Sequence, residues 1–249
     1  MKRVAAIYDI HGNLPALEAI LAELRRLGVD QVVVGGDVLP GPMPRETLEC
    51  LQVLDIPAHF ILGNGEVAVL EQMAGKDPAK VPELYRPIIR WNAAQLDSEH
   101  QRIVGCWPKT VRLDIAGLGT VLFCHATPQN EHDIFTRLTP EERLLPIFNQ
   151  LDLSMVVCGH THMQFDRMIG RVRVVNAGSA GMPFGEAGAD WLLLGPEVEL
   201  RHTAYDLASA AASIRATSYP QADDFAANNV LRPPSAEQML ALFTKAGLQ

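Results

Sequence analysis

Residues of metal-binding type stand in five short motifs, and each motif directly follows an apolar run. The motifs are Asp9-Ile10-His11, Gly36-Asp37, Gly63-Asn64, His125 and Gly159-His160-Thr161-His162. Carboxylate, amide and imidazole groups are ligands that transition metals and zinc accept. Loops at strand ends gather at one edge of an open α/β sheet, so we expect these side chains to converge although they are far apart in sequence.

A pair of divalent metal ions accounts for this mixture of ligand types. The ligands of one ion would be Asp9, His11, Asp37 and His162, and those of the other Asn64, His125 and His160. Asp37 would bridge both ions, because one carboxylate can bind two cations through its two oxygens. Mixed nitrogen and oxygen ligands favour Mn, Fe, Zn, Co or Ni over Mg or Ca. Two such ions, about 3.5–4 Å apart, activate water and stabilise the attacking and leaving oxygens of a displacement.

Alternating strand, loop and helix patterns place the motifs in an α/β protein. The patterns predict strands over 3–8, 31–34 and 59–62, and helices over 14–27 and near 45–53. The first helix shows leucine and isoleucine at helical spacing, with Asn13 as its N-cap and Gly28 as its stop signal.

The rest of the chain contains further strands and a helical end. Residues 67–107 predict helical segments that flank the sheet or overhang the site, one of them over 84–96. A hairpin is expected over 111–115 and 120–124, and strands over 155–158, 172–175, 191–194 and 198–202. After residue 205 an alanine-rich helix over 208–216 and a capping box at Ser235 and Gln238 are expected. The predicted organisation is a catalytic domain over 1–205 and a C-terminal helical extension over 206–249.

Composition narrows the classes of function. The formal net charge of −8 and the absence of a Lys/Arg cluster in the sequence disfavour binding to a nucleic-acid backbone. No run of 18 apolar residues predicts a membrane span. The four cysteines lack a C-x-x-C pair, and the N-terminus lacks a signal-peptide pattern, so we expect a cytoplasmic protein with reduced thiols.

The five motifs, taken in order, resemble the calcineurin-like metallophosphoesterase superfamily. The pattern D-x-H, GD, GN, H and GHTH spans about residues 4–180 and is weakest over 67–115. The resemblance implies an α/β fold, a four-layer α/β/β/α sandwich of two mixed β-sheets flanked by helices. It also implies a phosphatase or phosphodiesterase that uses hydroxide bridging two metals, with Asp37 and Asn64 in catalytic positions. The segment Asn176-Ala177-Gly178-Ser179 resembles the small bacterial and archaeal phosphoesterase branch.

One position departs from the pattern of the family. Many members carry a histidine after the asparagine, and this histidine is assigned to transition-state stabilisation or to protonation of the leaving oxygen. Here the segment reads Gly63-Asn64-Gly65-Glu66, so the general acid is unassigned. His132 is the best substitute by position, although a simple surface histidine is the favoured interpretation. Glu66 is interpreted as a solvated carboxylate or as a contact to the metal ligands.

Other interpretations stay open beside the leading one. Asn13 either contacts substrate phosphate or only caps the helix that follows it. The substrate is expected to be a small phosphorylated compound or a phosphoprotein, and the sequence leaves a homo-oligomer open. The alternative function is a metal-bearing scaffold that binds a protein partner and turns over little, because Gly65 replaces the expected histidine.

Overall fold

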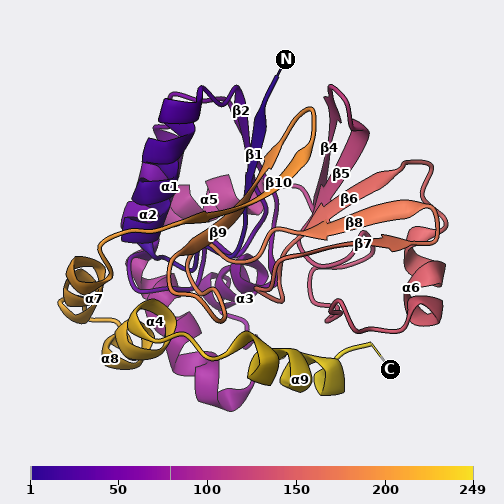
Figure 1. Cartoon of the computed structure of the whole chain (residues 1–249). Coiled ribbons are helices and arrows are strands. Elements are labelled where there is room, and N and C mark those ends of the chain that lie inside the picture. The colour runs from indigo at the N-terminus through magenta and orange to yellow at the C-terminus, as the bar shows by residue number, and fades with distance from the viewer. Residues whose placement is uncertain (1, 79, 249) are drawn as a thin grey trace.

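The computed structural model describes residues 2–78 and 80–248, and its frame is a pair of β-sheets packed face to face (Figure 1). Each sheet has five strands of mixed direction. Helices α1 (Leu14–Leu27) and α2 (Pro44–Gln52) cover the outer face of the first sheet, and α6 (Glu141–Phe148) covers that of the second. The predicted four-layer α/β/β/α sandwich is therefore confirmed.

The first sheet contains the strands that lead to the first three motifs. Its order is β10-β9-β1-β2-β3, in which β1, β2 and β3 are parallel and β9 and β10 complete an antiparallel side. The strands are β1 (Val4–Ile7), β2 (Gln31–Val34), β3 (Ala58–Phe60), β9 (Ala189–Leu194) and β10 (Val198–Thr203). All of them were predicted, with ends that differ by a residue or two.

The second sheet contains the strands that lead to the histidine motifs. Its order is β4-β5-β6-β8-β7. The strands are β4 (Thr110–Ile115), β5 (Gly119–Cys124), β6 (Met155–Cys158), β7 (Phe165–Ile169) and β8 (Val172–Asn176). The predicted hairpin is β4 and β5. Strand β7 was not predicted, because Met168 places an apolar side chain on its exposed face and masks the alternation.

Hydrophobic clusters fill the space between the layers. Ala5 and Ile7 of β1 face the helical layer, whereas Val4 and Ala6 face the second sheet. This division follows from the two-residue period of a strand, and it explains why a strand buried on both faces is apolar throughout. A further cluster holds Phe148 of α6 against the outer face of the second sheet.

Helix α1 begins and ends at the residues that the sequence predicted. The side chain of Asn13 accepts a hydrogen bond from the backbone N–H of Ala16 at 3.3 Å. Gly28 ends the helix in the left-handed region, at a φ of 64°. The helix is fixed at both ends, and its N-terminal end lies directly after the first metal-type motif.

The segment between β3 and β4 is helical, as expected. Its elements are α3 (Asn64–Met73), η1 (Glu83–Tyr85), α4 (Arg86–Gln95) and α5 (Ser98–Gly105). Helix α3 packs against both α4 and α5. Because α3 begins at Asn64, this helical layer is built directly from the third motif.

The C-terminal segment crosses beneath both sheets in Figure 1. It contains α7 (Leu207–Arg215), α8 (Ala222–Phe225), the π-helical turn η2 (Ala226–Leu231) and α9 (Ala236–Ala246), which Ser235 caps. Ile214, Phe225 and Val230 pack with Ile88 of α4 in one cluster. The division of the chain after residue 205 stays a prediction.

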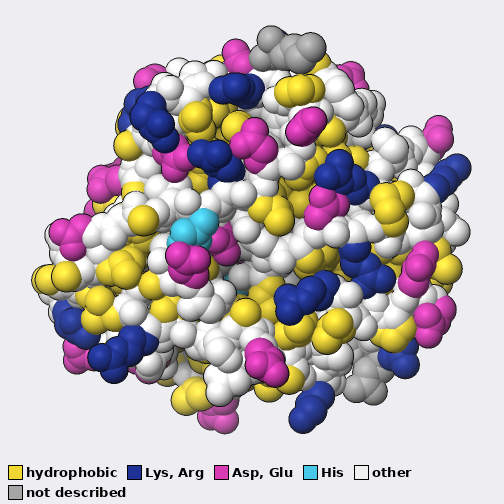
Figure 2. All heavy atoms as spheres, viewed as in Figure 1, with side chains coloured by type: hydrophobic (Ala, Val, Ile, Leu, Met, Phe, Trp, Pro, Cys, Tyr) yellow, Lys and Arg dark blue, Asp and Glu magenta, His cyan; other side chains and the backbone are white. Residues whose placement is uncertain are grey.

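The surface carries charges of both signs. Figure 2 shows Lys and Arg dispersed among Asp and Glu on the face in view, without a continuous basic patch there. In the part of the chain that the structure describes, no helix is long and apolar enough to cross a membrane.

Replacing Phe148 tests the packing of α6 on the second sheet. Phe148 is fully buried and meets Phe135 edge-on, with 5.7 Å between ring centroids. Phe148→Ala is expected to lower the free energy of unfolding, measured in urea, by about 3–5 kcal/mol, because it leaves a cavity. Leu138→Ala, at a side chain in an exposed position, is the control and should change it by less than about 0.5 kcal/mol. Equal effects of the two substitutions would contradict this packing.

Candidate metal centre

All of the predicted ligands lie at strand ends in one cluster. Asp9 and His11 follow β1, Asp37 follows β2, Asn64 begins α3 after β3, His125 follows β5, and His160 and His162 follow β6. Parallel strands bring their carboxyl ends to the same edge of a sheet, and the two sheets place those edges side by side. The fold therefore gathers these side chains.

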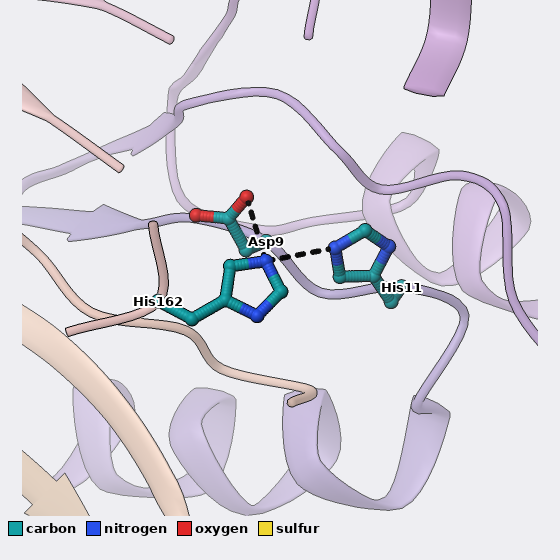
Figure 3. Close-up of side chains that lie close together, drawn as sticks. All are labelled: Asp9, His11 and His162. Atoms are coloured by element: carbon teal, nitrogen blue, oxygen red, sulfur yellow. Dashed lines mark hydrogen bonds and ion pairs between the residues drawn. The ribbon is translucent and has the colours of Figure 1, made fainter. Parts of the chain in front are cut away.

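Within the cluster, two groups of three side chains have ligand atoms within 4.8 Å of one another. One group is Asp9, His11 and His162 (Figure 3), and the other is Asp37, His125 and His160. Asn64 joins the second group, because its Oδ1 lies 3.1 Å from Nε2 of His125. Asp9, His11 and His162 were expected in one set, and Asn64, His125 and His160 in the other. Asp37, which was expected in the first set as the bridge, lies here with the second group, and metal binding by these residues stays a prediction.

Three histidine rings are oriented by backbone carbonyls. Nδ1 lies 3.2 Å from Pro40 O in His11, 3.0 Å from Gly35 O in His125 and 2.9 Å from Met182 O in His162. A carbonyl oxygen only accepts hydrogen bonds, so Nδ1 carries the hydrogen and a neutral ring presents an unprotonated Nε2. A carbonyl that fixes the tautomer in this way is typical of histidines that bind metal.

Asp9 provides a test of whether a cation fits here. Among the described residues, its Oδ1 is the one buried side-chain nitrogen or oxygen without a hydrogen-bond partner. Oδ1 lies 3.4 Å from Nε2 of His162 and 3.9 Å from Nε2 of His125 (Figure 3 shows the pair with His162). A buried carboxylate oxygen without a donor is costly unless a cation neutralises it. The donor set therefore fits metal ions.

Asp37 faces the histidines of both groups. Its Oδ1 accepts a hydrogen bond from the backbone N–H of Gly65 at 2.7 Å and lies 3.5 Å from Nε2 of His125. Its Oδ2 lies 3.8 Å from Nε2 of His11. The Gly65 N–H belongs to the first turn of α3, whose N-terminus favours negative charge. This is the position that a bridging carboxylate would require.

Burial and neighbouring charges shift the pKa values of the cluster in both directions. Burial and the charge of Asp9 raise the pKa of Asp37 well above its usual range. Although burial opposes it, the charges of His162 and its neighbours hold the pKa of Asp9 well below its usual range. Burial lowers the pKa of His11 and of His160 to about 3 each, so both rings are neutral at pH 7. Although burial opposes it, the charge of Asp9 raises the pKa of His162. Neutral histidines and ionised carboxylates are the forms that ligate metals, and the charge of a bound cation would favour both forms.

Backbone strain is concentrated at the same residues. In the described part of the chain, the non-glycine residues with positive φ are Asp9, His11, Asp37, His160 and His162, at 53°, 48°, 52°, 67° and 57°. Left-handed conformations cost about 1–3 kcal/mol each outside glycine and gather at functional sites, although Asp and His tolerate them better than most residues. Each strained residue is a predicted ligand, so the strain points to this cluster as the functional site.

Glu66 holds the loops of the cluster together, and its solvated interpretation is wrong. Its carboxylate is fully buried and accepts backbone N–H groups from Asp37, Leu39 and Gly63 at 2.8, 2.9 and 2.7 Å. Burial and the charge of Asp37 raise the pKa of Glu66 to about 7. The signal in the sequence was an acid in the first turn of a helix, but only the fold shows the loops that it joins.

Gly65 has no room for the histidine that many family members carry. A Cβ atom on Gly65 would lie 2.0 Å from the backbone oxygen of Leu39 and 2.8 Å from Cδ of Pro40. Such contacts require the 39–40 loop to move. The path of the 39–40 loop therefore requires glycine at position 65.

Both polar groups of the Asn13 side chain form hydrogen bonds within the fold. Asn13 is fully buried, its Oδ1 caps α1, and its Nδ2 donates to Gly181 O at 2.9 Å and to the Tyr205 hydroxyl at 3.2 Å. The predicted capping role is confirmed. A contact with substrate stays a prediction, and it would require one of these hydrogen bonds to open.

His132 lies at the rim of a cavity beside the cluster. A cavity of about 240 Å³ is lined by Asn64, His132 and Lys80, among others. Nε2 of His132 lies 3.3 Å from Nζ of Lys80, and its Nδ1 lies 3.5 Å from Glu131. The structure thus places His132 near the predicted second ion site, while its contact with substrate stays a prediction.

Two aromatic rings that the sequence did not single out connect the C-terminus to the cluster. Phe184 stacks on the ring of His162 with 5.4 Å between centroids. Phe243 of α9 lies 6.0 Å from Phe184 by the same measure. Helix α9 is therefore connected to the candidate ligand His162 through the ring of Phe184.

Replacing Glu66 tests its role in joining the loops. Glu66→Ala would leave three buried N–H groups without an acceptor, each costing about 1–3 kcal/mol. We expect the free energy of unfolding to fall by at least about 3 kcal/mol, and metal affinity to fall with it. Glu71→Ala, an exposed position on the same helix, is the control and should change neither quantity. Equal stability of the two variants would contradict the assigned role.

Solved structures share this architecture. A metallophosphoesterase from Sphaerobacter thermophilus is similar with a TM-score of 0.69 and 25% identity, over 92% of this chain and 99% of that one. The hypothetical protein PH1004 from Pyrococcus horikoshii OT3 is similar with a TM-score of 0.78 and 20% identity, over 94% of this chain and 100% of that one. These relatives are of the small bacterial and archaeal type that the motifs indicated.

A curated protein and a family model match the sequence itself. The uncharacterised protein MJ0912 from Methanocaldococcus jannaschii is 30% identical over 164 residues, which are 65% of this chain and 63% of that protein. The match thus spans less than two thirds of that relative. The model of the calcineurin-like phosphoesterase superfamily domain matches residues 1–195, a range that contains every candidate ligand. This chain is a member of the calcineurin-like phosphoesterase superfamily.

Proposed function

We propose that this protein hydrolyses a phosphate ester, as a phosphatase or phosphodiesterase, with two divalent metal ions. The observation that carries the proposal is the convergence of histidine Nε2 atoms on two buried carboxyl groups, one of which has an unpartnered oxygen. Acceptors of hydrogen bonds that face one another repel unless cations lie between them. The mixed nitrogen and oxygen donors favour Mn, Fe, Zn, Co or Ni.

The residues of the chain would bind and orient, and the ions would supply the activation. Two ions held here would polarise the phosphoryl oxygens and lower the pKa of bound water towards neutrality. Asp37 would belong to both ion sites, and Asn64 would add its amide oxygen to the second. His160 and His162 would be engaged as ligands, so neither would act as a general base. We place the reaction in the cytoplasm, on a small phosphorylated compound or a phosphoprotein.

The leaving oxygen needs a proton, and the usual donor is replaced by Gly65. His132 is the candidate that we propose, because it lines the cavity beside Asn64. Lys80 and Glu131 flank its ring and would orient it. The side chain of His132 is 42% exposed, so it is free to reach a bound ester.

Metal removal and Asp37→Ala test the proposed centre. Bis-p-nitrophenyl phosphate and p-nitrophenyl phosphate should be hydrolysed with added manganese and not after chelation. Asp37→Ala is expected to lower kcat/KM roughly a thousandfold, because a Lewis acid supplies several kcal/mol to the transition state. Asp114→Ala, an exposed aspartate of β4, should leave it unchanged. No turnover with any divalent metal would instead favour the scaffold that binds a protein partner.

The relative rates on aryl and alkyl phosphates test the effect of having glycine at position 65, where many family members have histidine. Aryl phosphates carry a leaving group that departs without protonation, so they should be hydrolysed faster than alkyl phosphates. His132→Ala should widen this gap by roughly 10²–10⁴-fold, the usual contribution of a general acid, whereas His59→Ala in β3 should not. Steady-state kinetics on a phenyl and methyl pair measures both effects. Equal turnover of the two esters would contradict the prediction.

A further inference from the structure

A cavity of about 360 Å³ opens beside His11, and neither the ligands nor the proposed proton donor account for it. Its lining includes Pro40 and Met182, whose backbone oxygens orient the rings of His11 and His162. The remaining walls come from α4 with the residue before it, and from the C-terminal segment between residues 219 and 234. A phosphate bound at the metal cluster would therefore hold its organic group at this cavity.

The walls of the cavity are largely aromatic and aliphatic. Ile88 and Ile89 of α4 and Tyr219 and Phe225 of the C-terminal segment contribute to them. The rings of Tyr219 and Phe225 meet edge-on, with 6.1 Å between centroids, and Trp91 supports Tyr219 from behind at 5.3 Å. Rings held in this way offer a rigid surface for an apolar or flat group.

Polar groups without partners line the same walls. Among the described residues, the side-chain amides of Gln221 and Asn229 and the hydroxyl of Tyr219 make no hydrogen bond. Asn228 donates to one carboxylate oxygen of Asp224 at 2.7 Å, which leaves the other oxygen as an acceptor. Asn228 and Asn229 belong to the π-helical turn η2, and such irregular turns occur frequently at functional sites. The occupant should therefore carry several hydrogen-bond donors and acceptors.

Charge and size restrict the occupant further. The described residues that line the cavity include no Lys or Arg, and Asp224 contributes a negative charge. A second phosphate group would find no cation here and would be repelled. The volume of about 360 Å³ corresponds to roughly twelve water molecules at about 30 Å³ each. That is far more than a methyl or ethyl group fills, and it suits a flat ring system.

We propose that this cavity binds the nucleoside part of a nucleoside phosphate ester that carries a single phosphoryl group. The base packs against the cavity wall to which Tyr219 and Phe225 contribute, and the amides of Gln221 and Asn229 with Asp224 pair with the polar edge of the base. The proposal rests on the proposed function, because the phosphoryl group of the same substrate lies at the metal cluster. It gives the C-terminal extension the task of selecting the substrate.

Two esters with the same leaving group test the proposal. Adenosine 5′-(p-nitrophenyl phosphate) and methyl p-nitrophenyl phosphate differ only in the group that the cavity would hold. With the manganese-loaded protein, we expect kcat/KM to be roughly ten- to a hundredfold higher for the adenosine ester, as stacking of a base on an aromatic ring supplies. Equal values for the two esters would overturn the proposal while leaving the proposed function intact.

A variant inside the cavity and one outside it separate this effect from general damage. Asn229→Ala should lower the preference for the adenosine ester by roughly tenfold, the loss of about one hydrogen bond. Asn149→Ala, an exposed asparagine after α6, should leave the preference unchanged. An unchanged preference in Asn229→Ala would contradict the proposed pairing of the η2 turn with the base.

Measuring the binding of a compound that is not hydrolysed tests the cavity independently of the metal ions. Adenosine, which has no phosphate, should bind the metal-free protein saturably and change the fluorescence of Trp91, which contacts Tyr219. The signal should disappear in Trp91→Phe, whereas calorimetry should still detect binding. If neither ester is hydrolysed, the proposed function fails, and adenosine binding alone decides the cavity. No adenosine binding by calorimetry would overturn the proposal.

Discussion

The structure depends on one electrostatic constraint, which is that ligand-type atoms of several loops converge while Oδ1 of Asp9, buried among them, has no donor. Nε2 of His162 and of His125 face Oδ1 of Asp9, and Nε2 of His125 also faces Asp37. Lone pairs and carboxylates arranged in this way repel one another. A folded chain that keeps them together needs positive charge among them, and divalent cations supply it in the least volume.

The fold holds this arrangement by rigid means. Three rings are fixed by backbone carbonyls, and the loops after β2 and β3 are tied to the buried carboxylate of Glu66. The positive φ angles of Asp9, His11 and Asp37 show that the backbone is bent to direct these side chains. Strain of this kind persists only where the surrounding packing over-determines it. The hydrophobic layers on both faces of β1 provide that packing.

The sequence predicted the strand-end motifs, and so most of the cluster, because ligand residues directly follow strands whose apolar runs are easy to recognise. It did not predict β7, whose exposed Met168 breaks the alternation, nor the burial of Glu66, because a carboxylate in the first turn of a helix is usually solvated. The steric exclusion at Gly65 depends on the path of the Leu39–Pro40 loop. The cavity beside His11 joins segments from residue 11 to residue 234. No local pattern encodes contacts of that range.

The C-terminal extension connects the candidate metal cluster to the cavity beside it. It packs on α4 through Ile88 and reaches His162 by way of Phe243 and Phe184. Its place beside the cluster means that the polar residues of η2 would lie close to a phosphate bound there, although they are far from the candidate ligands in sequence. The C-terminal segment therefore adds a wall to the cavity beside the strand-end cluster.

Calorimetric titration of the metal-stripped protein with Mn²⁺ tests whether the cluster holds two ions. Two ions should bind per chain, and the stoichiometry should fall when Asp37 is replaced by asparagine. The unfolding temperature should also rise on loading, since ligands that bind only the folded state stabilise it. Binding of no ions, or of one ion with the same stoichiometry in Asp37→Asn, would contradict a two-ion cluster.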